Sequence, residues 1–115
     1  MSRFRVGVGL AALAAGLVLG QAAFAASAEK GKTAYMKHGC WQCHGTVGQG
    51  GIAGPGLAQN PLPYEAFAAY VRTTSRAMPP YREPVLPDAD LADIHAYLQA
   101  VPKSPDAKNI PLLNP

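Results

Sequence analysis

Residues 40–44 read Cys40-Trp41-Gln42-Cys43-His44, and the rest of the chain is best interpreted outward from this pentapeptide. The two cysteines are three positions apart, so on one turn of helix both thiols face the same way. A histidine follows the second cysteine directly and adds an imidazole beside the pair. The segment therefore offers two thiols and one imidazole to a single bound group.

The pattern Cys-x-x-Cys-His is typical of the attachment site of a c-type haem. The thiols of Cys40 and Cys43 can each reach a vinyl group on one side of a porphyrin, and His44 then comes under the iron and supplies a nitrogen ligand. Covalent attachment lets a short chain hold a large apolar disc. We expect one such haem to fill the centre of a domain that is otherwise too small for a large core.

Three other uses of the cysteine pair remain open on the residues alone. A thioredoxin-like dithiol also has Cys-x-x-Cys, but no β-α-β pattern surrounds this one. A zinc site would need His38 or His95 to complete four ligands. A structural disulfide suits an exported protein but explains neither His44 nor the glycine-rich sequence that follows it. Haem attachment is favoured over all three.

The N-terminal segment has the order of a secretory signal peptide. Arg3 and Arg5 precede an apolar run over residues 6–19, and small residues follow, with Ala-x-Ala patterns that end at Ala25 and at Ala28. We therefore expect cleavage near Ala25 to Ala28 and export to the periplasm.

Removal of residues 1–26 leaves 89 of the 115 residues and takes away two of the ten basic side chains, so the net charge falls from +3 to +1. This balance argues against a nucleic-acid-binding protein, and the length argues against several domains. An uncleaved leader over residues 6–28 would instead be one membrane anchor, the only membrane association we expect. The expected order is a signal peptide (1–26), a folded domain (27–101) and an extended, proline-containing tail (102–115).

Helical periodicity is present in three segments. Residues 29–38 form a short polar stretch, residues 63–74 carry apolar side chains at helical spacing, and residues 88–101 have the clearest apolar stripe, with Asp88 as the expected N-cap. Residues 45–60 hold six glycines and no strand alternation. The sequence predicts an all-α domain of three main helices joined by long, constrained loops.

With these elements, the chain resembles a class I c-type cytochrome from the mature N-terminus to about Val101. Gly31 and Tyr35 resemble the small and aromatic pair with which the first helix of that family crosses the last helix. The matching contact residues on the last helix are Ile94, Tyr97 and Leu98. The resemblance implies the class I cytochrome c fold, with three main helices and long loops wrapped around one covalently attached haem.

The sequence Gly-Pro-Gly-Leu over residues 54–57 resembles the family's proximal loop. By that likeness, the carbonyl of Pro55 accepts a hydrogen bond from Nδ1–H of His44, which orients the ring and raises its basicity. Leu57 is then expected to pack on the haem.

The sixth iron ligand is expected to be Met78, which lies 34 residues after His44 in the sequence Met-Pro-Pro-Tyr (residues 78–81). Prolines stiffen this loop, so it can hold a thioether over the opposite face of the haem. The stretch also resembles the Met-Pro-Pro-aromatic pattern of bacterial members of the family. The other methionine of the mature chain, Met36, is expected to pack.

Four further polar side chains need an assignment. His95 is the competing sixth ligand, but it lies about 100° from the centre of the apolar stripe and is expected at the boundary or in solvent. His38 is expected on the surface. Arg72 is assigned to the haem environment, where its guanidinium would bond a propionate or a loop carbonyl, with a solvated helix end as the alternative. The same two readings hold for Arg76, which also lies just before Met78.

An iron held by His44 and Met78 has no free position, so we expect an electron carrier and not an enzyme. A thioether ligand also raises the reduction potential relative to two histidines. The function expected is that of a periplasmic monohaem cytochrome c that carries single electrons between a donor and an acceptor, such as a dehydrogenase and a terminal oxidase. The alternative is a small cytochrome c subunit of a periplasmic dehydrogenase complex that accepts electrons from its catalytic subunit.

Overall fold

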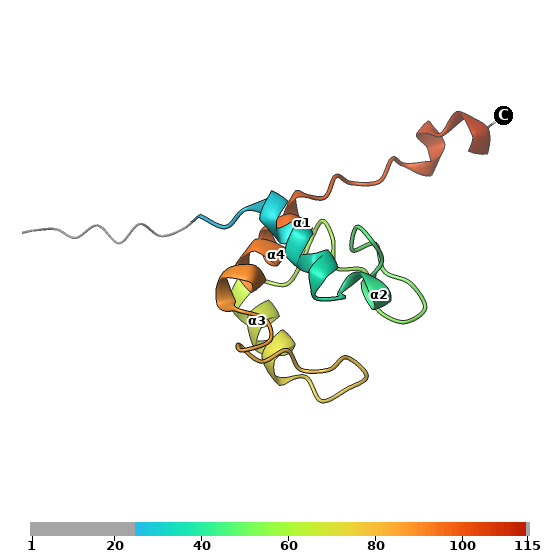
Figure 1. Cartoon of the computed structure of the whole chain (residues 1–115). Helices are drawn as coiled ribbons and strands as arrows, with labels where there is room; N and C mark the ends of the chain where they lie inside the picture. Colours follow the sequence, from blue (N-terminus) through green and yellow to red (C-terminus); the bar gives the residue numbers. More distant parts are fainter. Residues whose placement is uncertain (1–24, 115) are drawn as a thin grey trace, which may run out of the picture.

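The computed structural model describes residues 25–114, which contain α-helices and short 3-10 helices but no strand. The elements are α1 (Ala28–Lys37), α2 (Trp41–His44), α3 (Tyr64–Thr73), α4 (Asp88–Ala100), η1 (Ala107–Asn109) and η2 (Pro111–Leu113). The predicted all-α fold is confirmed, and α1, α3 and α4 are its three main helices (Figure 1). Over the same residues, no helix has the length and apolar character needed to cross a membrane. The predicted signal peptide lies almost entirely outside the described residues.

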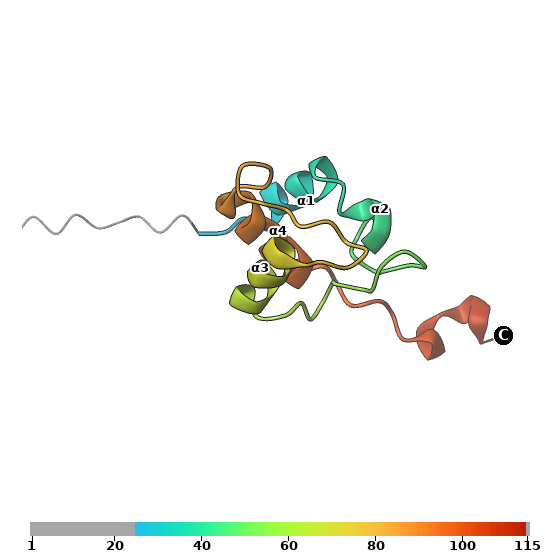
Figure 2. The same ribbon diagram turned by 90° about the horizontal axis from the view of Figure 1, so that it is seen from below.

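Helices α1 and α4 lie against each other in both ribbon views, and their crossing organises the domain (Figures 1 and 2). Gly31 sits at the crossing: a Cβ atom there would overlap the carbonyl group of Asp93 and would lie 2.8 Å from Cβ of Tyr97. The ring of Tyr35 packs on that of Tyr97 with 5.5 Å between centroids. A glycine is therefore required for this close approach of two backbones, as the resemblance implied.

The core is small and lies mostly on the inner faces of α3 and α4. Its buried apolar residues are Ala34, Tyr35, Phe67, Val71, Leu86, Leu91, Ile94, Tyr97 and Leu98. Leu91, Ile94 and Leu98 belong to the apolar stripe that helical spacing predicted for residues 88–101, and they form the main buried surface of α4; Val101, the last position of that stripe, is partly buried. One layer of side chains cannot fill the space between α2, α3 and the loops, and a cavity remains there.

Two helix starts show different chemistry. Ser27 caps α1: its Oγ accepts a hydrogen bond from the amide of Lys30, and its own amide donates to Oδ1 of Asp93 at 2.6 Å. For α4, the expected N-cap was Asp88, but the cap is Pro87 and no side chain bonds the first turn. Asp88 is instead the first residue of the helix, and its carboxylate is paired with the Arg72 guanidinium.

The tail differs in part from the extended conformation that its prolines predicted. Two 3-10 turns, η1 and η2, form near its end, and the Asn114 side chain bonds the carbonyls of Ala107 and Ile110. Local polar bonds of this kind offset the absence of packing. The tail extends away from the helical body, and Leu112 and Leu113 on it are exposed (Figures 1 and 2).

Candidate functional site

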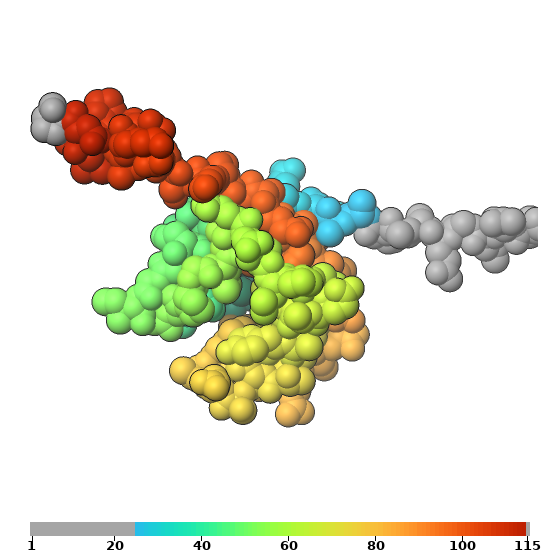
Figure 3. Space-filling model, turned by 180° about the vertical axis from the view of Figure 1, so that it is seen from behind, coloured from blue at the N-terminus to red at the C-terminus, as the bar shows by residue number. Residues whose placement is uncertain are grey.

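A cavity of about 630 Å³ opens between the glycine-rich loop after α2 and the loop that joins α3 to α4. The space-filling view shows a hollow between these two parts, which are coloured green and yellow (Figure 3). Apolar side chains dominate the lining, among them Leu57, Phe67 and Ile94. The volume and the apolar walls are those of a small-molecule or cofactor site.

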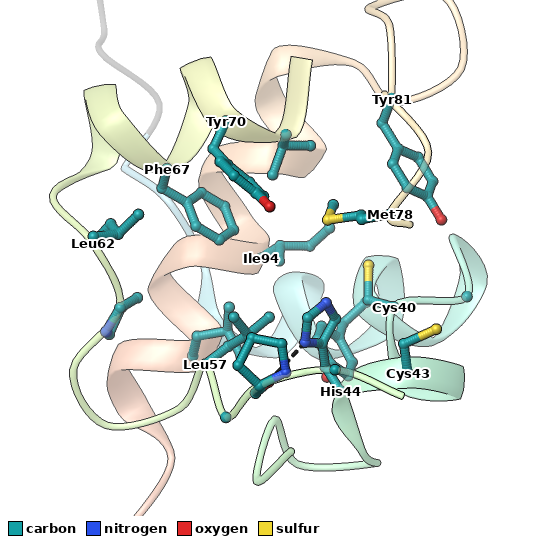
Figure 4. A pocket seen from close by; sticks show the side chains of 18 of the residues that line it. Cys40, Cys43, His44, Leu57, Leu62, Phe67, Tyr70, Met78, Tyr81 and Ile94 are labelled. Carbon is teal, nitrogen blue, oxygen red and sulfur yellow. Dashed lines mark hydrogen bonds between the residues drawn. The ribbon is translucent and has the colours of Figure 1, made fainter. Parts of the chain in front are cut away.

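The motif residues converge on one wall of this cavity. Gly39 adopts a positive φ of 78°, which ends α1 and turns the chain into the single turn of α2. Cys40, Cys43 and His44 all line the cavity as a result, with Cys40 partly buried and Cys43 exposed at its edge (Figure 4). The short helix thus presents both thiols and the imidazole to the same space.

The His44 ring is held by the loop that follows it. Its Nδ1 lies 2.8 Å from the carbonyl oxygen of Pro55, and because a carbonyl only accepts, Nδ1 carries the hydrogen. The ring is 8% exposed. A Cβ at Gly54 would lie 3.0 Å from the ring atoms Nδ1 and Cε1, so a glycine lets the loop come this close. The hydrogen bond fixes the tautomer and leaves Nε2 free to bind a metal.

Met78 faces His44 from the opposite wall. It lies on the loop between α3 and α4, is partly buried, and points its sulfur into the cavity (Figure 4). Leu57, which was expected beside the haem, also lines the cavity. The structure therefore brings together the residues that the sequence assigned to attachment and ligation.

Arg72 was expected in the haem environment, bonded to a propionate or to a loop carbonyl. It does not line the cavity; its Nη1 donates to the carbonyl oxygens of Tyr81 at 2.8 Å and Leu86 at 2.6 Å, and Nη2 pairs with Asp88. Of the two expected partners, the structure selects the loop carbonyl. The reason is that the chain after Met78 folds back along α3, so its carbonyls meet the guanidinium before any cavity atom can.

Both other histidines were expected at the surface, and both predictions are wrong. His95 is 7% exposed, donates from Nε2 to the carbonyl of Leu62 at 2.8 Å, and packs against the rings of Tyr64 and Phe67. It is not among the residues that line the cavity. The segment before α3, which includes Leu62, packs over His95. Helical periodicity within α4 cannot predict which other segment packs on the helix.

The side chain of His38 is 9% exposed, and its Nε2 lies 3.1 Å from Oδ2 of Asp90 on α4. It therefore joins α1 to α4 instead of facing solvent. Met36, which was expected to pack, is 40% exposed, because it lies on the outer side of α1. Only one methionine of the described chain therefore faces the cavity.

Three further cavity residues had weaker sequence signals than the ligands. Tyr70, Arg76 and Tyr81 also line it, and the Tyr81 hydroxyl donates to the carbonyl of His38 at 3.1 Å. Arg76 lies just before Met78, where a bond to a propionate or a loop carbonyl was expected, and Tyr81 is the aromatic residue of the Met-Pro-Pro-Tyr stretch. Tyr70 had only the signal of helical spacing, three positions after Phe67.

The alternatives for the cysteines find little support in the geometry. Burial raises the pKa of the Cys40 thiol to about 11, whereas a reactive dithiol needs a lowered thiol pKa. No three His, Cys, Asp or Glu side chains within residues 25–114 converge as a metal site would require. The two thiols are not bonded to each other.

The residues present fit a c-type haem. An apolar cavity holds two thiols on one wall, an imidazole whose free nitrogen faces inward, and a thioether on the opposite wall. Residues 26–98 match the model of the family described as cytochrome C oxidase, cbb3-type, subunit III. Searches among curated proteins and among solved structures gave no significant match.

That match covers more than half of the chain and contains the whole cavity wall from α1 to α4. A cytochrome c domain of this kind implies a covalently bound haem c and electron transfer with redox partners. The chain belongs to the cbb3-type cytochrome c oxidase subunit III family, and its folded part is a class I c-type cytochrome domain.

Proposed function

We propose that this chain is a monohaem electron carrier of the periplasm, with the haem bound through Cys40 and Cys43 and the iron held by His44 and Met78. The observation that carries the proposal is the placement of His44 and Met78 on facing walls of one apolar cavity, beside both thiols (Figure 4). The bound haem supplies a one-electron couple.

Each of these residues has a separate task. The bond from Nδ1 to the Pro55 carbonyl holds the His44 ring in one orientation, which keeps its ligand nitrogen in place in both oxidation states. The Met78 thioether favours the reduced state and so raises the potential. Apolar walls such as Leu57 and Phe67 exclude water from the site. An iron held by both His44 and Met78 would have no position left for a substrate, so the proposed role is transfer of electrons only.

Ligation by Met78 is tested with two methionine variants. The oxidised wild type is expected to show the weak red absorption of a sulfur-to-iron bond. Met78→Ala should abolish it, whereas Met36→Ala should retain it, because Met36 is exposed and does not line the cavity. The assignment would be contradicted if both variants kept the band or if both variants lost it.

We also propose that the leader is removed after Ala25, within the predicted range of residues 25–28. This site keeps Ser27, which caps α1 and donates its amide to Asp93. Cleavage after Ala28 would delete that cap and place a positive amino group at the positive end of the helix dipole. Intact-mass measurement of periplasmic protein tests this: one haem plus a chain that begins at Ala26 is expected, and a chain that begins at Glu29 would refute it.

The remaining boundary of the proposed domain lies at Val101, the C-cap of α4; the tail of residues 102–115 follows.

A second candidate function is supported by this tail. Leu112 is 93% exposed and Leu113 is also exposed, on a segment that extends away from the helical body. Apolar side chains in such a place suit a subunit that packs on a larger oxidoreductase, either a dehydrogenase or an oxidase of the kind that the family description names. Co-elution of the native protein with such a partner on size exclusion would favour a subunit, and elution alone would favour a diffusing carrier.

A further inference from the structure

The segment that carries Met78 has no hydrogen bonds of its own. Within the described chain, residues 77–80 neither donate to nor accept from another described residue. Pro79 and Pro80 lack an amide hydrogen, so they cannot form such a bond from the backbone nitrogen. The position of Met78 is therefore set by the residues on either side of this segment.

On the C-terminal side of this segment, the hydrogen bonds that fix the chain converge on Tyr81. Its amide donates to the carbonyl of Val71 at 2.9 Å, its carbonyl accepts from Nη1 of Arg72 at 2.8 Å, and its hydroxyl donates to the carbonyl of His38 at 3.1 Å. One residue is thus bonded to the end of α3 and to the turn that precedes Cys40. Only the two prolines, whose φ angles are fixed, separate it from Met78.

Arg72 ties this anchor to the rest of the fold. Its guanidinium bonds the carbonyls of Tyr81 and Leu86 and the carboxylate of Asp88, so it joins α3, the loop and the start of α4. We call the hydrogen bonds of Arg72 and Tyr81 the clamp. Leu86 is buried in the core, so one acceptor of the clamp is held rigidly. Hydrogen bonds from a charged donor are stronger than neutral ones, and the planar guanidinium serves three acceptors that one lysine nitrogen cannot match.

We propose that Arg72 and Tyr81 are positioning residues that hold Met78 against the iron. This inference rests on the proposed ligation by Met78 and adds to it the device that keeps the thioether in place. When the clamp is weakened, the stiff Met-Pro-Pro segment moves as a unit, and the population with the thioether detached increases. Neither residue needs to touch the iron for this effect.

The test compares Arg72→Lys and Tyr81→Phe with Arg82→Lys, a matched control on an exposed residue of the same loop whose side chain forms no hydrogen bond in the described chain. Arg72→Lys and Tyr81→Phe should weaken the red absorption band and lower the reduction potential, because a detached thioether no longer favours the reduced state. Cyanide should bind the oxidised form of Arg72→Lys about tenfold faster, which corresponds to the loss of one charge-assisted hydrogen bond, and that of Tyr81→Phe about fivefold faster, which corresponds to the loss of one neutral hydrogen bond. Arg82→Lys should match the wild type in all three measurements.

Wild-type values of the band, the potential and the cyanide rate in both Arg72→Lys and Tyr81→Phe would overturn the positioning role while leaving ligation by Met78 intact. A wild type that itself lacks the band would overturn the ligation, and the positioning role with it. If Arg72→Lys fails to accumulate, Tyr81→Phe decides, since it removes a single hydroxyl from a partly buried side chain.

Discussion

Nδ1 of His44 donates to the carbonyl oxygen of Pro55 across 2.8 Å, from the single turn of α2 to the loop that follows it. A hydrogen bond at this nitrogen gives the imidazole more negative character, which makes it a stronger donor to a metal and stabilises the higher oxidation state. The carbonyl comes this close because Gly54 has no side chain to meet the ring. The loop therefore affects the potential through a backbone atom.

Gly54→Ala should weaken that bond, since its Cβ would lie 3.0 Å from Nδ1 and Cε1 of His44 and also from the Cys43 carbonyl oxygen. A less basic imidazole stabilises the oxidised state less, so the reduction potential should rise, by on the order of tens of millivolts. Redox titration of the holoprotein measures the change. Gly51→Ala is the matched control, because no atom lies within 4 Å of its Cβ position. A potential that is the same in both variants would contradict the proposed role of this loop.

The crossing of α1 and α4 should tolerate no side chain at Gly31. Gly31→Ala would force a methyl group into the Asp93 carbonyl, so the helices must separate and the packing of Tyr35 on Tyr97 must loosen. We expect the free energy of unfolding to fall by about 1–3 kcal/mol. Denaturant unfolding of the holoprotein gives this value, and the same Gly51→Ala control should stay within about 0.5 kcal/mol of the wild type. Equal losses in the two variants would show that the crossing has room to adjust.

The site residues that the sequence predicted directly are those that belong to short motifs, in which neighbouring residues fix the geometry. The spacing of Cys40, Cys43 and His44 places three functional groups on one turn, whatever surrounds it. Prolines around Met78 likewise restrict that loop without reference to other segments. Long-range partners were not encoded in this way. His95 was assigned to the surface because its position within α4 says nothing about the carbonyl of Leu62, which covers it from a distant loop.

The sequence did not identify the acceptors of the Arg72 side chain, for the same reason. Its place before Met78 indicated a role near the haem, but its acceptors, the carbonyls of Tyr81 and Leu86, are set by the path of the loop. Every residue has a backbone carbonyl, so the sequence does not indicate which of them accepts a given hydrogen bond. Predictions of elements therefore succeeded, whereas the partners of His38 and His95 in other elements were missed, and the bond from His44 to Pro55 was expected only through the resemblance.

His95→Leu separates the buried structural role of this histidine from ligation. The variant leaves the Leu62 carbonyl without its donor inside the protein, so the free energy of unfolding should fall by about 1–3 kcal/mol. The red absorption band and the reduction potential should stay at their wild-type values, because His95 does not line the cavity. Unfolding curves and visible spectra of the same sample provide both measurements. A wild type that lacks the band, together with a His95→Leu variant that gains it, would instead place His95 at the iron.

Alkaline pH should destabilise the fold through its buried tyrosines. Burial raises the pKa of Tyr35 above its ordinary value of 10.0, and it raises the pKa of Tyr97 in the same direction. The folded chain thus holds these phenol protons more tightly than the unfolded chain. The resulting stabilisation is fully present below about pH 10 and is lost as the pH rises toward the folded pKa, by about 1.4 kcal/mol per pH unit for each group.

Tyr35→Phe should change this pH dependence in a recognisable way. At about pH 8 the variant should be less stable by about 1 kcal/mol, because a phenyl ring cannot donate to the carbonyl of Gly45 as the Tyr35 hydroxyl does at 2.8 Å. Above about pH 10 its free energy of unfolding should fall less steeply than that of the wild type, since one titrating group is gone. Denaturant unfolding at a series of pH values measures both effects, and any alkaline change at the iron enters both proteins equally. Parallel curves for the two proteins across this range would show that Tyr35 ionises no differently in the folded and unfolded chains.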